Sequence, residues 1–268
     1  MSEADAVERS EAPVTADRLV DDLRALGVEA GDVLLVHSSL SSLGWVPGGA
    51  QTVVDALQRA VTDSGTLVLP THSSQLCSSE LWSNPPIPDD WLPEVREAMP
   101  AYDPDVTPTR GMGAIPECFR THPDVRRSAH PSNSFAAWGA ERDAVVDNHG
   151  LDYGLGEESP LAAVYERDGR VLLLGVGHEA NTSLHLAEDR AEYDTETVTE
   201  EGPVRRDGER QWVTFEDVER ETDDFPTLGA AFEADVGLRE GTVGLADAKL
   251  ADQRALVDYA TTWMTENR

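Results

Sequence analysis

The stretch RVLLLGVG at residues 170–177 carries the clearest strand pattern in the chain. A continuous apolar run that ends in turn-forming glycines is typical of a parallel strand buried on both faces. GDVLLVH at 31–37 has the same character, and TLVL at 66–69 is a shorter example. Apolar residues recur at helical spacing over 15–26 and again over 50–61. The order helix–strand–helix–strand predicts a βαβ crossover, and therefore a parallel sheet with helices on its faces.

The remaining segments extend this α/β pattern. Residues 192–220 alternate polar and β-forming side chains, which predicts a meander of antiparallel strands in the C-terminal part. We therefore expect an α/β fold with a central, largely parallel sheet plus this meander. A single domain is expected over 14–268, behind a flexible acidic leader at 1–13. Further predictions are a helix within 110–120, a strand at 134–138, helices at 141–148, 182–191, 225–236 and 251–265, and a long excursion over the active face at 73–108.

Composition excludes several classes of partner. The 268 residues include 21 lysines and arginines against 51 aspartates and glutamates, a net charge of −30. So acidic a surface repels nucleic-acid phosphates and anionic membranes. No apolar run approaches the roughly 20 residues that span a bilayer. Two cysteines, Cys77 and Cys118, do not suggest a disulfide framework, and a cytoplasmic location is expected.

The charge itself has two interpretations. It could adapt the surface to concentrated salt, where carboxylates keep a protein hydrated, or it could attract a polycationic substrate. Because the carboxylates are spread along the whole chain, we favour adaptation to salt.

The main candidate for chemistry is the segment GHEANTSLHLAE at 177–188, which follows a buried strand. Functional sites on open α/β sheets gather beyond the carboxyl ends of strands. His185 and Glu188 are three apart on the predicted helix, so their side chains share one face. Glu188 could hold one ring nitrogen of His185 and leave the other free to act as a general base. On the spacing alone, a surface pair with no catalytic role is the more common arrangement.

Two other interpretations of this segment remain weaker. GVGHEA at 175–180 matches the Gly-x-Gly-x-x-Ala dinucleotide fingerprint, but a bulky His-Glu pair occupies the position that the pyrophosphate would approach. A metal site built from His178, Glu179, His185 and Glu188 lacks the familiar ligand spacing, so no metal is expected.

Two polar loops could bind a co-substrate. The segment from His37 through Ser38 and Ser39 to Gly49 places hydroxyls and backbone N–H groups between a strand and a helix, which suits phosphate or amide groups. Arg126 and Arg127 could supply positive charge to a nucleotide phosphate, or could pair with nearby carboxylates. The residues leave these alternatives open.

Taken in order, these segments resemble the aminoglycoside 3-N-acetyltransferase (antibiotic N-acetyltransferase) family. The landmarks are residues 33–49, GTLVLPT at 65–71, RGMG at 110–113, SAHP at 128–131 and NTSLHLAE at 181–188. The resemblance covers roughly residues 15–193. It implies an α/β/α-type fold particular to this family and acetyl-CoA as donor.

The resemblance also assigns roles to residues. The catalytic histidine and glutamate fall on His185 and Glu188, with a supporting threonine at Thr71. The residues expected to bind CoA are His37, Ser38, Ser39, Arg110, Gly111, Met112, Gly113 and Ser128.

The reaction expected is direct transfer of an acetyl group to the 3-amino group of an aminoglycoside-like acceptor, in a ternary complex and without metal. Asp152, Glu157 and Glu192 are candidates for holding the cationic acceptor, by proximity in sequence. The expected partners are CoA and this small amine, with neither nucleic acid nor membrane; a homodimer is among the open oligomeric states. The alternatives are a CoA-binding relative that acts on another amine or is catalytically idle, and a metal-dependent hydrolase.

Overall fold

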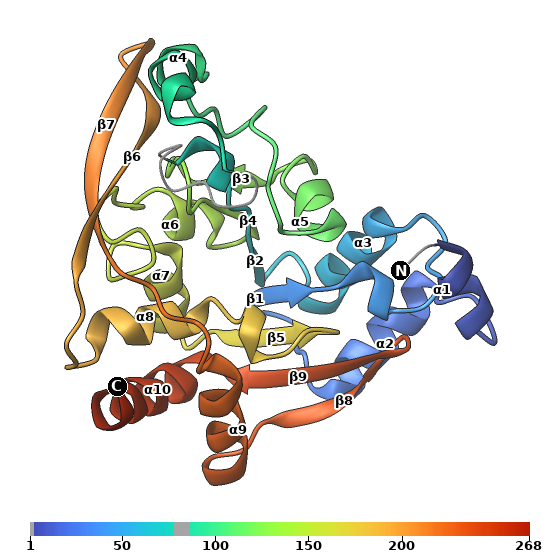
Figure 1. Cartoon of the computed structure of the whole chain (residues 1–268). Coiled ribbons are helices and arrows are strands. Elements are labelled where there is room, and N and C mark those ends of the chain that lie inside the picture. Colours follow the sequence, from blue (N-terminus) through green and yellow to red (C-terminus); the bar gives the residue numbers. More distant parts are fainter. Residues whose placement is uncertain (1–2, 78–85) are drawn as a thin grey trace.

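The computed structural model describes residues 3–77 and 86–268, and its centre is a seven-stranded mixed sheet (Figure 1). The strand order is β3-β4-β2-β1-β5-β9-β8. The three central strands, β2 (Thr66–Pro70), β1 (Val33–Ser38) and β5 (Arg170–Leu174), run parallel, with Leu34 paired to both Leu67 and Arg170. The predicted α/β class is confirmed, with the parallel pairings at the centre of the sheet.

The outer strands pair antiparallel. β4 (Phe135–Gly139) and β3 (Arg126–Arg127) extend one edge, while β9 (Ala246–Asp252) and β8 (Arg239–Val243) extend the other. The sequence did not predict β8 and β9. β8 is largely exposed and β9 mixes charged with small side chains, so neither forms a continuous apolar run.

Helices cover both faces of the sheet. Leu34 and Val36 of β1 pack into a core with α2 (Ala16–Leu26), α3 (Ala50–Val61) and α5 (Ala114–Phe119). Leu35, between them, points into the opposite core, because successive side chains of a strand face opposite sides. The helices of that second core are α6 (Arg142–Val146), α7 (Pro160–Glu166), α8 (Ser183–Arg190), α9 (Phe225–Asp235) and α10 (Gln253–Asn267).

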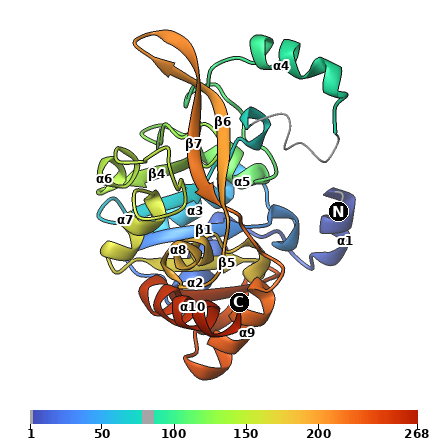
Figure 2. The same cartoon turned by 60° about the vertical axis from the view of Figure 1, so that its left-hand side comes forward.

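The predicted meander is a two-stranded antiparallel ribbon that rises from the body of the molecule. It consists of β6 (Thr197–Arg206) and β7 (Glu209–Val218), and its outer part lies beside α4 (Leu92–Ala98) (Figure 2). An ion pair between Arg96 and Glu201 joins the ribbon to α4. The ribbon returns the chain to α8 at Val218, which matters for the site described below.

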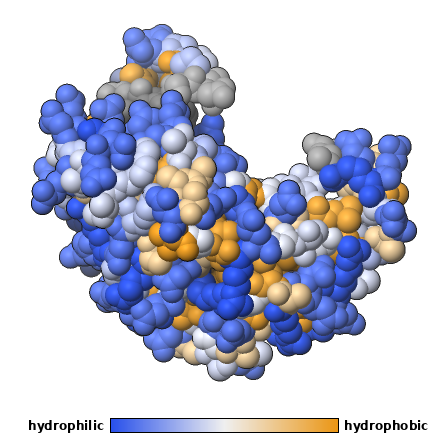
Figure 3. Space-filling view, turned by 90° about the horizontal axis from the view of Figure 1, so that it is seen from below, coloured by the Kyte–Doolittle hydropathy of each residue, from blue (hydrophilic) through white to orange (hydrophobic). Residues whose placement is uncertain are grey.

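The N-terminal segment expected as a leader contains a helix that the sequence did not predict. α1 (Glu3–Arg9) buries Ala6 and lies against the 3-10 turn Leu40–Ser42 after β1. Arg9 donates to the carbonyl of Ser41, and Ser10 accepts from the backbone N–H of Trp45. Seen from below, the surface is hollowed between the projection that carries α1 and the opposite side of the molecule (Figure 3). Among the described residues no helix is both long and apolar enough to cross a membrane.

Candidate active site

A cavity of about 330 Å³ lies where the central strands end and α8 begins. His37 and Ser38 reach it from the end of β1, and Thr182 and His185 from the first turn of α8. Met112 and Phe225 also line it. The cavity therefore lies beyond the carboxyl ends of parallel strands, where α/β sheets commonly bind their ligands.

His185 and Glu188 form the hydrogen-bonded pair that their spacing predicted. Nδ1 of His185 lies 2.5 Å from Oε2 of Glu188. The carboxylate is fully buried and the imidazole is 14% exposed. With Nδ1 donating to Glu188, Nε2 is the ring atom left to accept a proton in the cavity. The ring is also packed against Phe225, with centroids 5.1 Å apart. Its tautomer and its orientation are thus both fixed by neighbours.

The Glu188 carboxylate is held ionised in spite of its burial. Burial acts to raise its pKa, but hydrogen bonds from His185 and Arg268 and the charge of Arg220 outweigh burial, and the pKa lies below its ordinary value. Oε1 accepts from Nη1 of Arg268 at 2.8 Å and from the backbone N–H of Glu221 at 3.2 Å. An ionised carboxylate in this position favours the imidazolium form that a general base passes through.

Thr71 lies elsewhere and its hydroxyl is engaged. It is fully buried at the end of β2, donates to the carbonyl of Ser134 at 3.1 Å and accepts from Nε of Arg127 at 3.1 Å. Thr71 does not belong to the described lining of the cavity. Ser38 does, and its Oγ is buried without a hydrogen-bond partner among the described residues. Of these two hydroxyl residues, Ser38 is therefore the one that the structure places beside the cavity.

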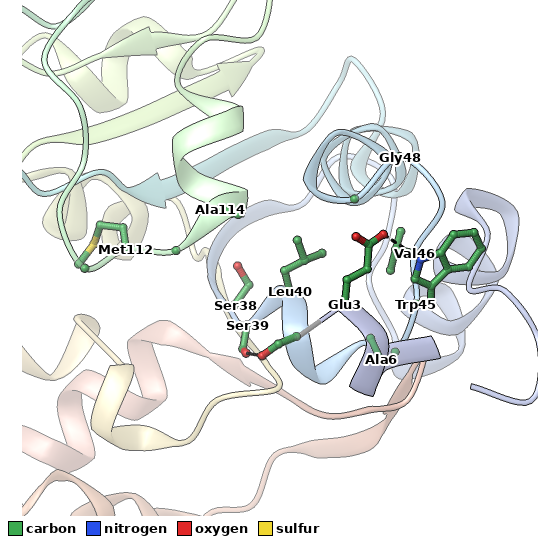
Figure 4. A pocket seen from close by; sticks show the side chains of 15 residues that line it. Glu3, Ala6, Ser38, Ser39, Leu40, Trp45, Val46, Gly48, Met112 and Ala114 are labelled. Carbon is green, nitrogen blue, oxygen red and sulfur yellow. Dashed lines mark hydrogen bonds between the residues drawn. The ribbon is translucent and has the colours of Figure 1, made fainter. Parts of the chain in front are cut away.

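A second cavity, of about 750 Å³, adjoins the first and is shown in Figure 4. Ser38 and Ser39 line it from the end of β1, and Gly111, Met112 and Gly113 line it from the turn before α5. Ser38, Gly111 and Met112 belong to both linings, so the two cavities meet at these residues. The predicted CoA residues from these two loops are thus brought together.

The wall of this cavity also contains groups that the sequence analysis missed. α1 contributes Glu3 and Ala6, and Oε1 of Glu3 accepts from Nε1 of Trp45 at 3.2 Å (Figure 4). The helix was missed because its sequence is short and acidic, and its one buried side chain, Ala6, leaves no apolar pattern.

Two other residues expected near CoA, Arg110 and Ser128, have different surroundings. Arg110 precedes the lining residue Gly111, and its backbone N–H donates to the carbonyl of His72. Ser128 is buried outside both described linings, where its Oγ accepts from the backbone of Phe135 and lies 2.8 Å from Nδ1 of His149.

The two adjacent arginines of β3 are engaged within the protein. Arg126 pairs with Asp143 and Asp147 on the surface, and the buried Arg127 donates to the carbonyls of Thr71 and Thr107. Of the two roles considered for these arginines, Arg126 therefore has the second, pairing with carboxylates. The described linings of the two cavities contain neither arginine.

The acids expected near the acceptor are dispersed. Asp152 is exposed and caps the backbone of Glu216 in β7, while Glu157 pairs with Arg190 beside a separate cavity. Glu192 is exposed after α8. The described lining of the smaller cavity contains none of the three.

Other acids lie close to the pair. Arg220 bonds Asp189 at 2.7 Å and Asp217 at 2.5 Å, and lies 3.6 Å from Glu188. Burial, followed by the charge of Asp217, raises the pKa of the nearby Glu200. Asp217 was missed because only the return of the ribbon brings it next to α8.

The residues weighed for a metal site do not converge. Nε2 of His178 bonds Glu233 of α9 at 2.9 Å, whereas His185 bonds Glu188. Glu179 accepts from the backbone N–H of Gly177. Among residues 3–77 and 86–268, no group of three or more His, Cys, Asp or Glu side chains has the arrangement of a metal site.

Several imidazoles of the chain are uncharged near neutral pH, and two of them, His37 and His72, lie close enough to His185 to feel its charge. Burial, followed by the charge of His185, lowers the pKa values of His37 and His72 to about 3. Burial lowers the pKa of His130 to about 4 and that of His149 well below its ordinary value. His72 was missed by the sequence analysis, although it directly follows a predicted strand.

These imidazoles predict acid lability. In the unfolded chain a histidine has a pKa of about 6.5, so between that value and about 4 the unfolded state binds more protons than the native state. We expect the free energy of unfolding to be greatest near neutrality and to fall as the pH falls from 6.5 to 4. Urea midpoints measured across this range in molar KCl, which screens the repulsion among carboxylates, test this. A midpoint that stays constant or rises on acidification would contradict it.

Comparison with known proteins supports these landmarks. Residues 35–265 match the family model described as aminoglycoside 3-N-acetyltransferase. The chain is 43% identical to the SPbeta prophage-derived aminoglycoside N(3')-acetyltransferase-like protein YokD of Bacillus subtilis (strain 168), over 97% of this chain and 96% of that protein. It is 37% identical to aminoglycoside N(3)-acetyltransferase VII of Streptomyces paromomycinus, over 99% of this chain and 96% of that protein.

Solved structures agree. The crystal structure of YokD from Bacillus subtilis superposes with a TM-score of 0.96 and 42% identity, covering 98% of both chains. AAC-IIIb in its binary complex with CoASH superposes with a TM-score of 0.86 and 31% identity, covering 95% of this chain and 97% of that one. AAC-VIa bound to sisomicin gives 0.86 at 32% identity, covering 96% and 99%.

Proposed function

The chain belongs to the aminoglycoside 3-N-acetyltransferase family, and from that premise we propose that it transfers an acetyl group from acetyl-CoA to an amine of an aminoglycoside-like acceptor, with His185 as general base. The observation that carries this proposal is the His185–Glu188 pair, whose imidazole lines the smaller of two adjoining cavities. The larger cavity would hold CoA and the smaller the reacting groups.

The larger cavity suits CoA through backbone groups more than through charge. Its described lining contains neither lysine nor arginine. It does contain Gly48 and Gly49 at the start of α3, where Gly49 is the N-cap and no side chain caps the helix. Free N–H groups at a helix N-terminus attract phosphate oxygens. A related structure contains CoASH, which supports the same ligand here.

The chemistry follows from the position of the base. The amine nitrogen attacks the thioester carbonyl carbon while Nε2 of His185 takes its proton. The C–S bond then breaks, and the CoA thiolate leaves and is reprotonated by the imidazolium. Glu188 stabilises that imidazolium. Ser38, which belongs to both linings, is the hydroxyl we assign to the carbonyl oxygen in place of Thr71.

We propose direct transfer without an acetyl-enzyme. The described lining of the smaller cavity contains no cysteine. Cys118 packs against the core, where burial raises the pKa of its thiol, and the Sγ of Cys77 donates to the carbonyl of Ser74. Neither is a thiolate poised for attack.

The acceptor is proposed to be a polycation. A related structure is bound to sisomicin, and the described lining of the smaller cavity contains one acid, Glu179, which is exposed. We assign the transfer to the 3-amino group on the family name, and place the reaction in the cytoplasm of a salt-adapted cell because acetyl-CoA is cytoplasmic and the net charge is −30.

Product analysis tests the function. The protein is incubated with acetyl-CoA and sisomicin in concentrated KCl, and the product is examined by mass spectrometry and NMR. The expected product carries one acetyl group on the 3-amino nitrogen. Unmodified sisomicin, together with unmodified polyamines and simple amines, would contradict the proposal.

Filling the larger cavity should block the donor. Ala114 lines it at the first residue of α5 and is exposed (Figure 4). Ala114→Trp is expected to weaken CoA binding at least tenfold, or about 1.4 kcal/mol, by occupying ligand volume. Calorimetric titration with CoA measures this, with Ala230→Trp on the exposed side of α9 as the matched control. Equal affinity in both variants would place CoA elsewhere.

A further inference from the structure

Arg268, which directly follows α10, is hydrogen-bonded to Glu188 of the His185–Glu188 pair. Its Nη1 donates to Oε1 of Glu188 at 2.8 Å, the oxygen that does not accept from His185. α10 packs against α8, and Arg268 is not among the described residues that line the cavity. The two oxygens of Glu188 therefore bind different groups: Oε1 accepts from Arg268, and Oε2 orients the imidazole of His185.

The guanidinium is itself fixed on every side. Nε and Nη2 bond both oxygens of Asp224, at 2.8 and 2.6 Å, and Nη2 also donates to the carbonyl of Glu221 at 2.7 Å. The ring of Tyr193 lies 5.2 Å from the guanidinium carbon, and its hydroxyl lies 3.2 Å from Nη1. The side chain is only 8% exposed. A fork held at this many points has little freedom left to lose when it binds a carboxylate.

A second arginine shares the carboxylate but has a different task. Arg220 lies 3.6 Å from Oε2 of Glu188, beyond hydrogen-bond distance, and directs its hydrogen bonds to Asp189, Asp217 and the carbonyl of His185. Arg220 therefore joins the ribbon to α8. Among the described side chains other than His185, only Arg268 is hydrogen-bonded to the Glu188 carboxylate.

We propose that Arg268 is a positioning residue that sets the orientation of Glu188, and through it the orientation and protonation behaviour of His185. This inference rests on the proposed function for its effect on turnover, but its effect on the imidazole is independent of it. Without the fork, the Glu188 carboxylate can rotate, so its hydrogen bond to Nδ1 of His185 is no longer held in one orientation and weakens. Outer partners that orient metal-ligating side chains commonly change activity by about 10–100-fold, and we expect an effect of the same order from Arg268.

The charged groups that face Glu188 define what a pH profile reports. On α8 they are His185 and Asp189; from the end of the ribbon come Arg220 and Asp217; beside α9 lies Asp224, which stays with Arg268. Removing Arg268 takes away one of the groups that keep Glu188 ionised. The acid limb of the pH profile for kcat should therefore move to higher pH.

The test compares Arg268→Met and Arg268→Lys with Arg254→Met. Arg254 lies in the first turn of α10 and pairs with a carboxylate, Asp168. This pair is exposed and outside the described linings of both cavities. Arg268→Met is expected to lower kcat about 10–100-fold with little change in the KM for acetyl-CoA. Arg268→Lys keeps the charge but not the planar fork, and its kcat should lie between those of Arg268→Met and wild type. Guanidinium at non-denaturing concentration should partly restore Arg268→Met, and Arg254→Met should match wild type.

Nitrogen-15 NMR of the imidazoles provides the second readout. The resonance of His185, assigned by its loss in His185→Ala, should show a protonated Nδ1 in a strong hydrogen bond in wild type and a weakened one in Arg268→Met. Unchanged kcat, pH profile and Nδ1 resonance in Arg268→Met would overturn the inference. If wild type fails to acetylate any amine, the proposed function fails, yet the Nδ1 resonance still decides whether Arg268 positions the pair. If Arg268→Met does not fold, the same comparison is made with Arg268→Lys.

Discussion

Replacing His185 with alanine is expected to lower kcat for amine acetylation by about 10²–10⁴-fold, the usual contribution of a general base. The amine is largely protonated near neutrality, and Nε2 of His185 is the base that the structure directs into the smaller cavity. The thioester would still bind next to Ser38 and Met112, because both line the larger cavity, whose described lining does not contain His185. Steady-state rates of CoA thiol release, measured at saturating acetyl-CoA and acceptor, give the comparison.

The binding of CoA separates a catalytic defect from a folding defect. His185→Ala should bind CoA with nearly the affinity of wild type and unfold at a similar urea concentration. His122→Asn is the matched control, because His122 lies on the surface near Asp55 and away from both cavities. A His185→Ala protein with wild-type kcat would remove His185 from the mechanism.

Replacing Glu188 with alanine should destabilise the protein as well as inactivate it. The carboxylate is fully buried and accepts from His185, Arg268 and the backbone of Glu221. Breaking a buried ion pair costs about 3–5 kcal/mol when the partner is left alone. Arg268 keeps Asp224, so we expect about 3 kcal/mol, the lower end of that range. Chemical unfolding of the two proteins in concentrated KCl measures the difference.

Glutamine at this position should not rescue stability. Its amide would present N–H donors to Arg268 or His185, which are donors themselves, so one contact becomes unfavourable. The control is Glu157→Ala, whose exposed pair with Arg190 should be worth at most about 1 kcal/mol. Equal stability of Glu188→Gln and wild type would show that the charge of Glu188 is not needed for folding.

Much of the fold could be predicted because its parallel centre consists of continuous apolar runs. β1, β2 and β5 are buried on both faces, and that leaves a direct signal in sequence. β8 and β9 leave none, because an exposed edge strand and its partner tolerate charged side chains. α1 was equally invisible, since the contacts that hold it come from residues 41–45 rather than from its own pattern.

The candidate site divides in the same way. His185 and Glu188 could be paired from sequence because they share one helix and contact each other locally. Arg220 and Arg268 could not, because they reach Glu188 from residues 32 and 80 positions further on, separations set by tertiary packing. The acceptor acids Asp152, Glu157 and Glu192 were chosen by proximity along the chain, which says little about proximity in space. Thr71 shows a related limit. Its position after a strand could be predicted, but its hydrogen bonds with Ser134 and Arg127 could not.

The central claim is that a bound amine triggers release of CoA at the His185 cavity. It is tested most directly by measuring CoA thiol release from acetyl-CoA in concentrated KCl, with and without sisomicin, for wild type and His185→Ala. We expect release that depends on the amine in wild type and is lost in the variant. Release that does not depend on the amine would contradict this expectation. So would the absence of release by a folded wild-type protein that binds CoA and is offered aminoglycosides and simpler amines.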